Sequence, residues 1–129
     1  MAAQANTISR LETNVATAFE VLGWEVELAG ARCIFLDALI GELMPTMSGE
    51  QKTRLLEGLH AVDLLGQHLT SLSAFARRMS AEAPAGVVGV SEALSEITLG
   101  ALADRMTTAF GGEEETADDE SDAGDLDLF

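Results

Sequence analysis

Asp63 and Gln67 are the two residues of this chain whose types and spacing most clearly suggest chemistry. They lie midway along a predicted helix that runs from about Gln51 to Met79. Because an α-helix turns about 100° per residue, two residues four positions apart project from one face, one turn apart. The amide of Gln67 can both donate to and accept from water and does not titrate, so it can orient a water molecule without acting as a strong base. We therefore predict that the face of the helix that carries Asp63 and Gln67 is the functional surface of the protein.

The rest of this helix leaves that surface open. Its apolar residues point mostly elsewhere, at spacings of three, four or seven (Leu55, Leu59, Val62, Leu69, Leu72 and Met79). Gly66, Thr70 and Ala74 are small, so we expect another molecule's backbone to come close there, with Thr70 among its contacts. An ordinary interpretation stays open beside this one, in which Gln67 is a solvated helix residue and Asp63 a surface carboxylate near Lys52 or Arg54.

Other polar residues near the pair have two interpretations each. His60 lies on the same side of the helix, and could be a contact residue or the phosphorylatable histidine of a phosphotransfer four-helix bundle. His68 is predicted at a helix–helix boundary. Arg78, beside Arg77 near the end of the helix, opposes the helix dipole and could also meet an acidic rim on a partner. We expect no metal site, because no His, Cys and carboxylate set has ligand spacing on one face.

Composition predicts an all-α protein. The 129 residues suffice for one domain, 47% of them are hydrophobic, and Tyr is absent. The formal charge of −15 makes nucleic acid a poor partner. Cys33 is the only cysteine and no run of apolar residues is long enough to span a bilayer, so we expect a cytoplasmic protein with no membrane contact.

The hydrophobic periodicity predicts a long antiparallel hairpin. A first helix is expected from Asn6 or Thr7, either of which could cap it, to Leu43, with glycines that permit a kink. Pro45 ends it, and Ser48 begins a capping box for the second helix, which runs to about Ser80. The residues that recur every seven positions in the first helix are Ile8, Val15, Leu22, Ala29, Leu36 and Leu43.

The remainder of the chain is predicted to hold a loop, a third helix and a tail. The loop covers residues 81–89, and the third helix runs from Ser91, as its cap, to Ala109, so that residues 1–110 form the helical domain. Residues 111–124 are predicted to be a disordered acidic linker, and the last 19 residues carry nine acids and no base. Residues 125–129 are predicted to be a docking peptide, in which Leu126, Leu128 and Phe129 contact a partner.

The motif Asp63-Leu64-Leu65-Gly66-Gln67 resembles the D-L-T-G-Q signature of CheZ, the chemotaxis phosphatase of phosphorylated CheY. The chain's end, Asp125-Leu126-Asp127-Leu128-Phe129, is similar to the apolar peptide with which that family docks on CheY. His60, Ala61 and Val62 depart from the residues usual before the motif, and the chain is shorter than a typical CheZ. The resemblance implies a homodimeric four-helix bundle, which the apolar stripes of a lone hairpin also favour.

The resemblance also implies a function. It makes the protein a phosphatase of a phosphorylated CheY-like response regulator, a receiver domain of two-component signalling. Gln67 would orient the attacking water and Asp63 would pair with the receiver's lysine. The phosphatase would need no cofactor of its own, because the receiver supplies Mg²⁺. Two alternatives remain open: a receiver-binding adaptor or phosphotransfer bundle that uses His60, and a flagellar or secretion chaperone.

Overall fold

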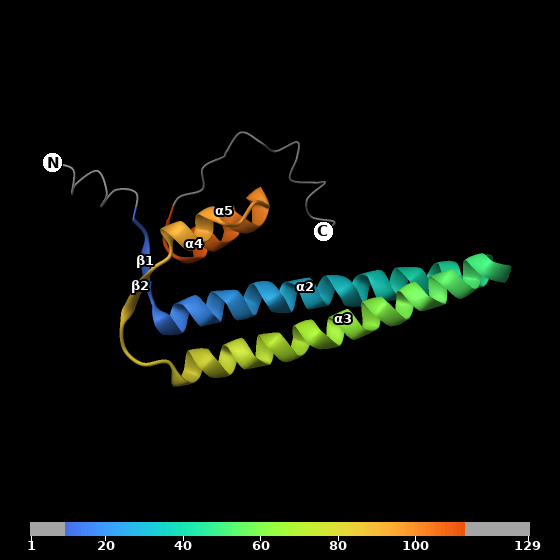
Figure 1. Cartoon of the computed structure of the whole chain (residues 1–129), viewed down its shortest axis with the longest axis horizontal. Coiled ribbons are helices and arrows are strands. Elements are labelled where there is room, and N and C mark those ends of the chain that lie inside the picture. Colours follow the sequence, from blue (N-terminus) through green and yellow to red (C-terminus); the bar gives the residue numbers. More distant parts are fainter. Residues whose placement is uncertain (1–9, 113–129) are drawn as a thin grey trace. The chain divides into compact units, whose positions relative to one another are not determined.

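The computed structural model describes residues 10–112, which are mostly helical (79%), and this confirms the all-α class. The predicted bundle and homodimer remain predictions. None of the helices in these residues is long and apolar enough to cross a membrane. In chain order the elements are β1 (Glu12–Asn14), α2 (Val15–Leu43), the 3₁₀ helix η1 (Met44–Thr46), α3 (Gly49–Glu82), β2 (Val87–Gly89), α4 (Ser91–Ser95) and α5 (Gly100–Ala109) (Figure 1).

The chain divides into two compact units, through both of which α2 and α3 run. One unit is the middle of the helical hairpin, Leu22–Ala76. The other contains the two ends of the chain, of which residues 10–21 and 77–112 are described. The predicted acidic linker lies outside the described residues apart from Gly111 and Gly112, and the whole docking peptide lies outside them.

The predicted hairpin is confirmed, and its turn forms where proline interrupts the helix. Pro45 lies in the first turn of η1, directly after α2 ends at Leu43. The Thr46 hydroxyl donates to the Leu43 carbonyl over 2.6 Å, which satisfies one acceptor that the helix end leaves open. The two helices of the hairpin then run antiparallel, joined by a short connection (Figure 1).

Small residues let α2 and α3 approach each other in the hairpin unit. Ser73 is buried and its hydroxyl donates to the carbonyl of Gly23, which is also buried, over 3.0 Å. Gly30 is buried too, and a Cβ added there would lie 3.5 Å from the Cβ of Leu69. α2 continues through both glycines, so the kink that they permitted does not interrupt the helix.

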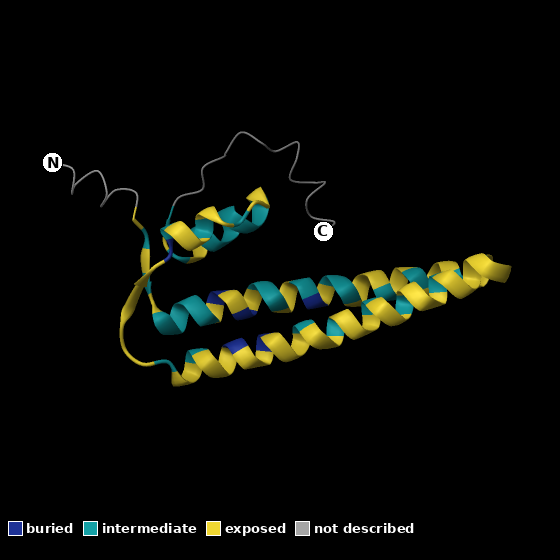
Figure 2. Cartoon of the chain, viewed as in Figure 1, coloured by how far each residue is buried: buried dark blue, intermediate teal, exposed yellow. Residues whose placement is uncertain are grey.

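Most large apolar side chains of the hairpin remain exposed. Figure 2 shows that exposed and intermediate residues make up most of α2 and α3. Gly66 faces Cys33 of α2, and because successive residues turn by about 100°, Gln67 and Leu65 project to opposite sides of the hairpin. The same rotation, counted from Cys33, places Ile34 on the side of Gln67 and Leu36 on the side of Leu65. We call the Leu65 side the apolar face; its exposed leucines are Leu36, Leu39, Leu43, Leu65 and Leu72, with 40–55% of each accessible.

In the other unit, residues predicted to be helix and loop form a two-stranded antiparallel ribbon. Glu12 pairs with Gly89, and Asn14 with Val87. The predicted helix start at Asn6 or Thr7 is therefore wrong, because residues 12–14 take up ladder hydrogen bonds, and α2 begins at Val15. The Asn14 side chain accepts a hydrogen bond from the Thr17 amide over 2.7 Å, as an N-cap does. The expected loop 81–89 likewise ends in a strand.

The third helix is broken in two, contrary to the prediction. Leu99 has extended backbone angles (φ −80°, ψ 106°), which interrupt the helix. Glycine, which follows at position 100, is a poor helix former, and α5 starts as a separate helix at Gly100. Ser91 does not cap α4: Val90 holds that position, and the Ser91 hydroxyl accepts from the Leu11 amide over 2.5 Å. Gly111, with φ 94°, ends α5 as predicted.

The N-cap gives a test of where α2 begins. Asn14→Ala should lower the free energy of unfolding by about 1 kcal/mol, because it leaves an amide of the first turn without its acceptor. The measurement is thermal unfolding followed by circular dichroism at one protein concentration. Asn6→Ala removes the alternative cap and should change little; if Asn6→Ala destabilises the fold and Asn14→Ala does not, the helix begins earlier than Val15.

Candidate functional site

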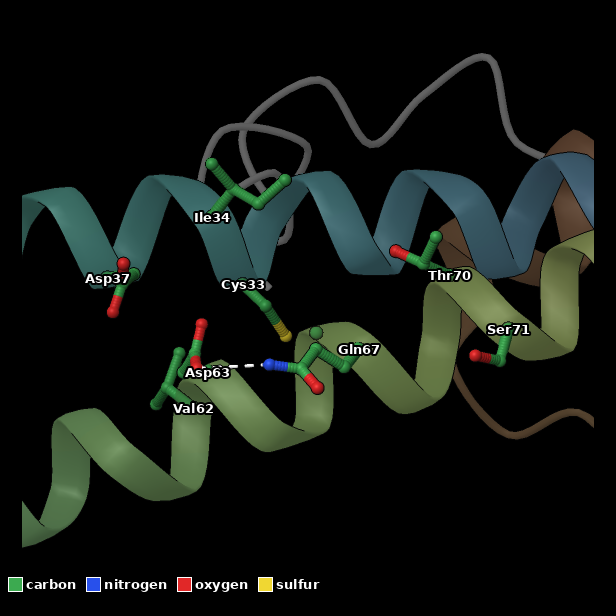
Figure 3. Close-up of a pocket in the computed structure, with 9 residues that line it drawn as sticks. Cys33, Ile34, Asp37, Val62, Asp63, Gln67, Thr70 and Ser71 are labelled. Atoms are coloured by element: carbon green, nitrogen blue, oxygen red, sulfur yellow. Dashed lines mark hydrogen bonds between the residues drawn. The ribbon is translucent and has the colours of Figure 1, made fainter.

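The structure places Asp63 and Gln67 on one exposed face of α3, as predicted. Nε2 of Gln67 donates to Oδ2 of Asp63 over 3.2 Å, and both side chains are exposed (Figure 3). This hydrogen bond turns the NH₂ group of the amide toward Asp63 and leaves Oε1 pointing away from it (Figure 3). The pair therefore presents one free carboxylate oxygen and one free amide acceptor to solvent.

Close contact between the helices forms the base of the site. A Cβ added to Gly66 would lie 3.5 Å from the Cβ of Cys33, and one added to Gly30 would lie 3.8 Å from Oγ1 of Thr70. We expected the small residues of α3 to admit a partner's backbone, but Gly66 faces the chain's own first helix instead. Its small size accordingly brings α2 alongside the Asp63–Gln67 pair.

A groove of about 430 Å³ lies between α2 and α3 at this point, and Figure 3 shows the residues that line it. We call it the Gln67 groove. One wall comes from α3 and holds both predicted residues together with Thr70. The other wall comes from α2. The complete lining is Cys33, Ile34, Asp37, Val62, Asp63, Gly66, Gln67, Thr70 and Ser71.

A smaller hollow of about 180 Å³ adjoins this groove and contains His60. Asp37 and Asp63 line both hollows, one from each helix, so they mark the boundary between the His60 end and the Gln67 end. None of the described residues that line the two hollows is lysine or arginine. The site therefore offers carboxylates from two helices and an amide, which suits a cationic group and a water molecule.

Sequence reasoning missed the α2 wall. Asp37 follows Cys33 by one helical turn, so their shared side of α2 could be read from the sequence. Which residues of α3 they would face could not, since that depends on the register between the two helices. Gly66 supplies the register, and its contact with Cys33 is a feature of the folded hairpin.

The other predicted site residues are distributed unevenly. Thr70 lines the Gln67 groove and His60 lines the adjoining hollow. Arg78 belongs to the other unit, where its Nε donates to the carboxylate of Glu82, one turn later on α3. Both of those side chains are exposed (80% and 61%). Leu126, Leu128 and Phe129 lie outside the described residues.

Neither Lys52 nor Arg54 joins the site. Arg54 lines a different hollow, with Met47, Gln51 and Leu55, whereas the hydrogen bond of Asp63 is made with Gln67. Within residues 10–112, no group of three His, Cys, Asp or Glu side chains could hold a metal ion.

Fold and site together define a class: an all-α protein in which a long hairpin carries a groove between its helices, lined by Asp37, Asp63 and Gln67 among others. The chain belongs to the family described as a domain of unknown function (DUF8776), which it matches over residues 25–129. That span includes both walls of the Gln67 groove and continues to Phe129. No curated protein and no solved structure matches the chain.

The close approach at Gly66 can be tested directly. Gly66→Leu should lower the free energy of unfolding by about 1–3 kcal/mol, because the added side chain meets Cys33 and forces the helices apart. Gly41→Leu is the matched control, since no atom lies within 4 Å of a Cβ added there and leucine favours helix more than glycine does. Denaturant unfolding of both variants gives the comparison; equal stabilities would contradict the packing described here.

Proposed function

We propose that the protein is a phosphatase that hydrolyses the phosphoaspartate of a CheY-like response regulator in chemotaxis signalling, acting in the cytoplasm. The observation that carries the proposal is the Gln67 amide, held by Asp63 on an exposed face midway along a helical hairpin. The resemblance of residues 63–67 to the CheZ signature suggests that this geometry serves the hydrolysis of a phosphoaspartate. The groove beside the pair supports the proposal because it leaves room for a partner's side chain.

The chemistry needs little from this protein beyond positioning. Water attacks phosphorus, a new P–O bond forms, the bond from phosphorus to the aspartate oxygen breaks, and inorganic phosphate and a free carboxylate result. The receiver contributes Mg²⁺ and a lysine, which stabilise the charge on the phosphoryl group. Gln67 accepts a hydrogen bond from the attacking water through Oε1, so that the water's lone pair is directed at phosphorus.

Asp63 has two roles in this proposal, one for each oxygen. Oδ2 accepts from Gln67 and fixes the amide's orientation. Oδ1 is available for the ammonium group of the receiver's lysine, and this ion pair sets the register of the receiver on α3. Asp63 is therefore expected to act on both binding and rate, whereas Gln67 acts mainly on rate.

The apolar face supports the homodimer that belongs to this proposal. Within Leu22–Ala76, Ala76 has the only apolar side chain that is buried, with 3% of the residue's surface exposed. The leucines of the apolar face are 40–55% exposed. A second copy that packs on this face would bury them in a four-helix bundle. Because the Gln67 groove lies on the opposite side, both copies would keep their grooves open.

The C-terminal peptide completes the proposal. Leu126, Leu128 and Phe129 would dock on the same receiver at the end of the predicted acidic linker, which would raise the effective concentration of the receiver near the groove. Arg78 could contact an acidic rim of the receiver, although its pairing with Glu82 accounts for its position equally well.

A second candidate function has one observation in its favour. His60 is exposed and lines a hollow with Asp37 and Asp63, so a phosphoryl group could be transferred to it. In that case the protein is a histidine phosphotransfer bundle and binds the same class of receiver. The two candidates differ in the fate of the phosphoryl group, which appears as inorganic phosphate in the first and on the protein in the second.

The first test is the loss of phosphate release in Gln67→Ala. Removing a preorganised polar contact to a transition state costs about 10²–10³ in rate, and we expect that loss here, with helicity unchanged by circular dichroism. The assay follows phosphate release from purified CheY-like receivers that are prephosphorylated with phosphoramidate. Gln51→Ala, the same change elsewhere on α3, is the control. If Gln67→Ala releases phosphate as fast as the wild type and the phosphoryl group appears on His60, the protein is a phosphotransfer bundle and not a phosphatase.

The second test concerns the homodimer. Light scattering should give about twice the chain mass of 13.6 kDa. Leu65→Glu should reduce the mass to that of one chain, because it places a charge on the apolar face. Ile34→Glu puts the same charge on the groove side, at a side chain that is 67% exposed, and should leave the dimer intact. If Leu65→Glu stays dimeric and Ile34→Glu becomes monomeric, the interface lies on the groove side of the hairpin instead.

A further inference from the structure

Asp37 lines the site but lies outside the sequence motif of residues 63–67. It lies on α2, opposite the helix that carries the motif, and lines the Gln67 groove and the adjoining hollow together with Asp63. In Figure 3 Asp37 projects from α2 on the side where Asp63 projects from α3. Asp37 is half-buried, whereas Asp63 is exposed, so the surroundings restrict the position of Asp37 more closely.

We infer that Asp37 is a specificity-determining residue of the Gln67 site, which contacts, from the second helix, the same cationic side chain of the receiver that Asp63 contacts. This inference rests on the proposed function and names the receiver feature that the groove selects. The occupant is an ammonium or guanidinium group inserted between α2 and α3.

The charges of the groove support this assignment. Among the described residues that line the two hollows, the carboxylates are Asp37 and Asp63, His60 lies in the smaller hollow, and none is lysine or arginine. Two carboxylates on opposite walls attract one cation from both sides, and they repel a receiver that presents an acidic side chain at that position. Asp63 already shares one oxygen with Gln67, so a second carboxylate supplies acceptors that Asp63 alone lacks.

The packing of the hairpin explains how Asp37 reaches the site. Cys33, one turn before Asp37 on α2, meets Gly66 on α3, which lies between Asp63 and Gln67 in sequence. Since residues one turn apart share a side of the helix, Asp37 continues the Cys33 side toward the level of Asp63. The carboxylate therefore depends on the close helix contact for its place, and a chain with only the motif on α3 would lack it.

The experiment measures affinity, so that it does not depend on catalysis. The probe is a CheY-like receiver activated with Mg²⁺ and beryllofluoride, titrated into the full-length protein at fixed salt. Asp37→Asn should raise Kd about fivefold, as expected for the loss of one partly exposed charge contact at an interface. Glu42→Gln is the matched control, because it removes the same charge from an exposed position on α2 that lines neither hollow, and its Kd should equal that of the wild type.

A double-mutant cycle tests whether the two carboxylates share one cation. If they do, Asp37→Asn combined with Asp63→Asn raises Kd by less than the product of the two single effects, since the second change removes a contact already weakened by the first. Equal affinities of Asp37→Asn and Glu42→Gln would overturn the inference, as would fully multiplicative effects. Failure of the proposed function gives a different result from these two outcomes. In that case receivers bind, but their rate of phosphate loss is the same with the wild type and with Gln67→Ala. If no receiver binds at all, both proposals are wrong.

Discussion

The close approach of α2 and α3 at Gly30 and Gly66 is the constraint on which the site depends. Each glycine would be unfavourable in an isolated helix by about 1 kcal/mol relative to alanine. In the hairpin, a Cβ added at either glycine would lie 3.5 Å from a side chain of the facing helix, so a larger side chain there would push the helices apart. The separation of the helices decides whether residues on α2 can act together with Asp63 and Gln67. A wider hairpin would keep the motif and lose the second wall of the groove.

The same packing explains why the hairpin has two different sides. A two-helix hairpin buries one stripe from each helix, and small residues fill much of that stripe here, so little apolar surface is covered within Leu22–Ala76. Large apolar residues must then project elsewhere, and leucines gather on the side away from the groove. Exposed leucines in a row stabilise association more than they stabilise a single chain. In the proposed homodimer, one side of the hairpin would serve self-association while the other would carry the Gln67 groove.

Much of the hairpin could be predicted from the sequence, because periodicity and the helix-ending Pro45 act locally. The ribbon of Glu12–Asn14 with Val87–Gly89 could not, since strand pairing joins segments far apart in the chain and each is only three residues long. The apolar repeat ran through Asn14 without a break and concealed its role as a cap. The site shows the same contrast: Asp63 and Gln67 share a helix and were found by spacing, whereas Asp37 needed the register between two helices.

In the proposed mechanism, the hydrogen bond between Gln67 and Asp63 connects binding to the placement of water. An exposed glutamine has several rotamers, and only those that direct Oε1 toward the receiver's phosphoryl group can position an attacking water. Asp63 selects among them by holding Nε2. A cation between Asp37 and Asp63 would immobilise the Asp63 carboxylate, and with it the amide. The receiver that brings the correct basic side chain would then also organise the group that hydrolyses its phosphoaspartate, so specificity and rate would arise from one contact.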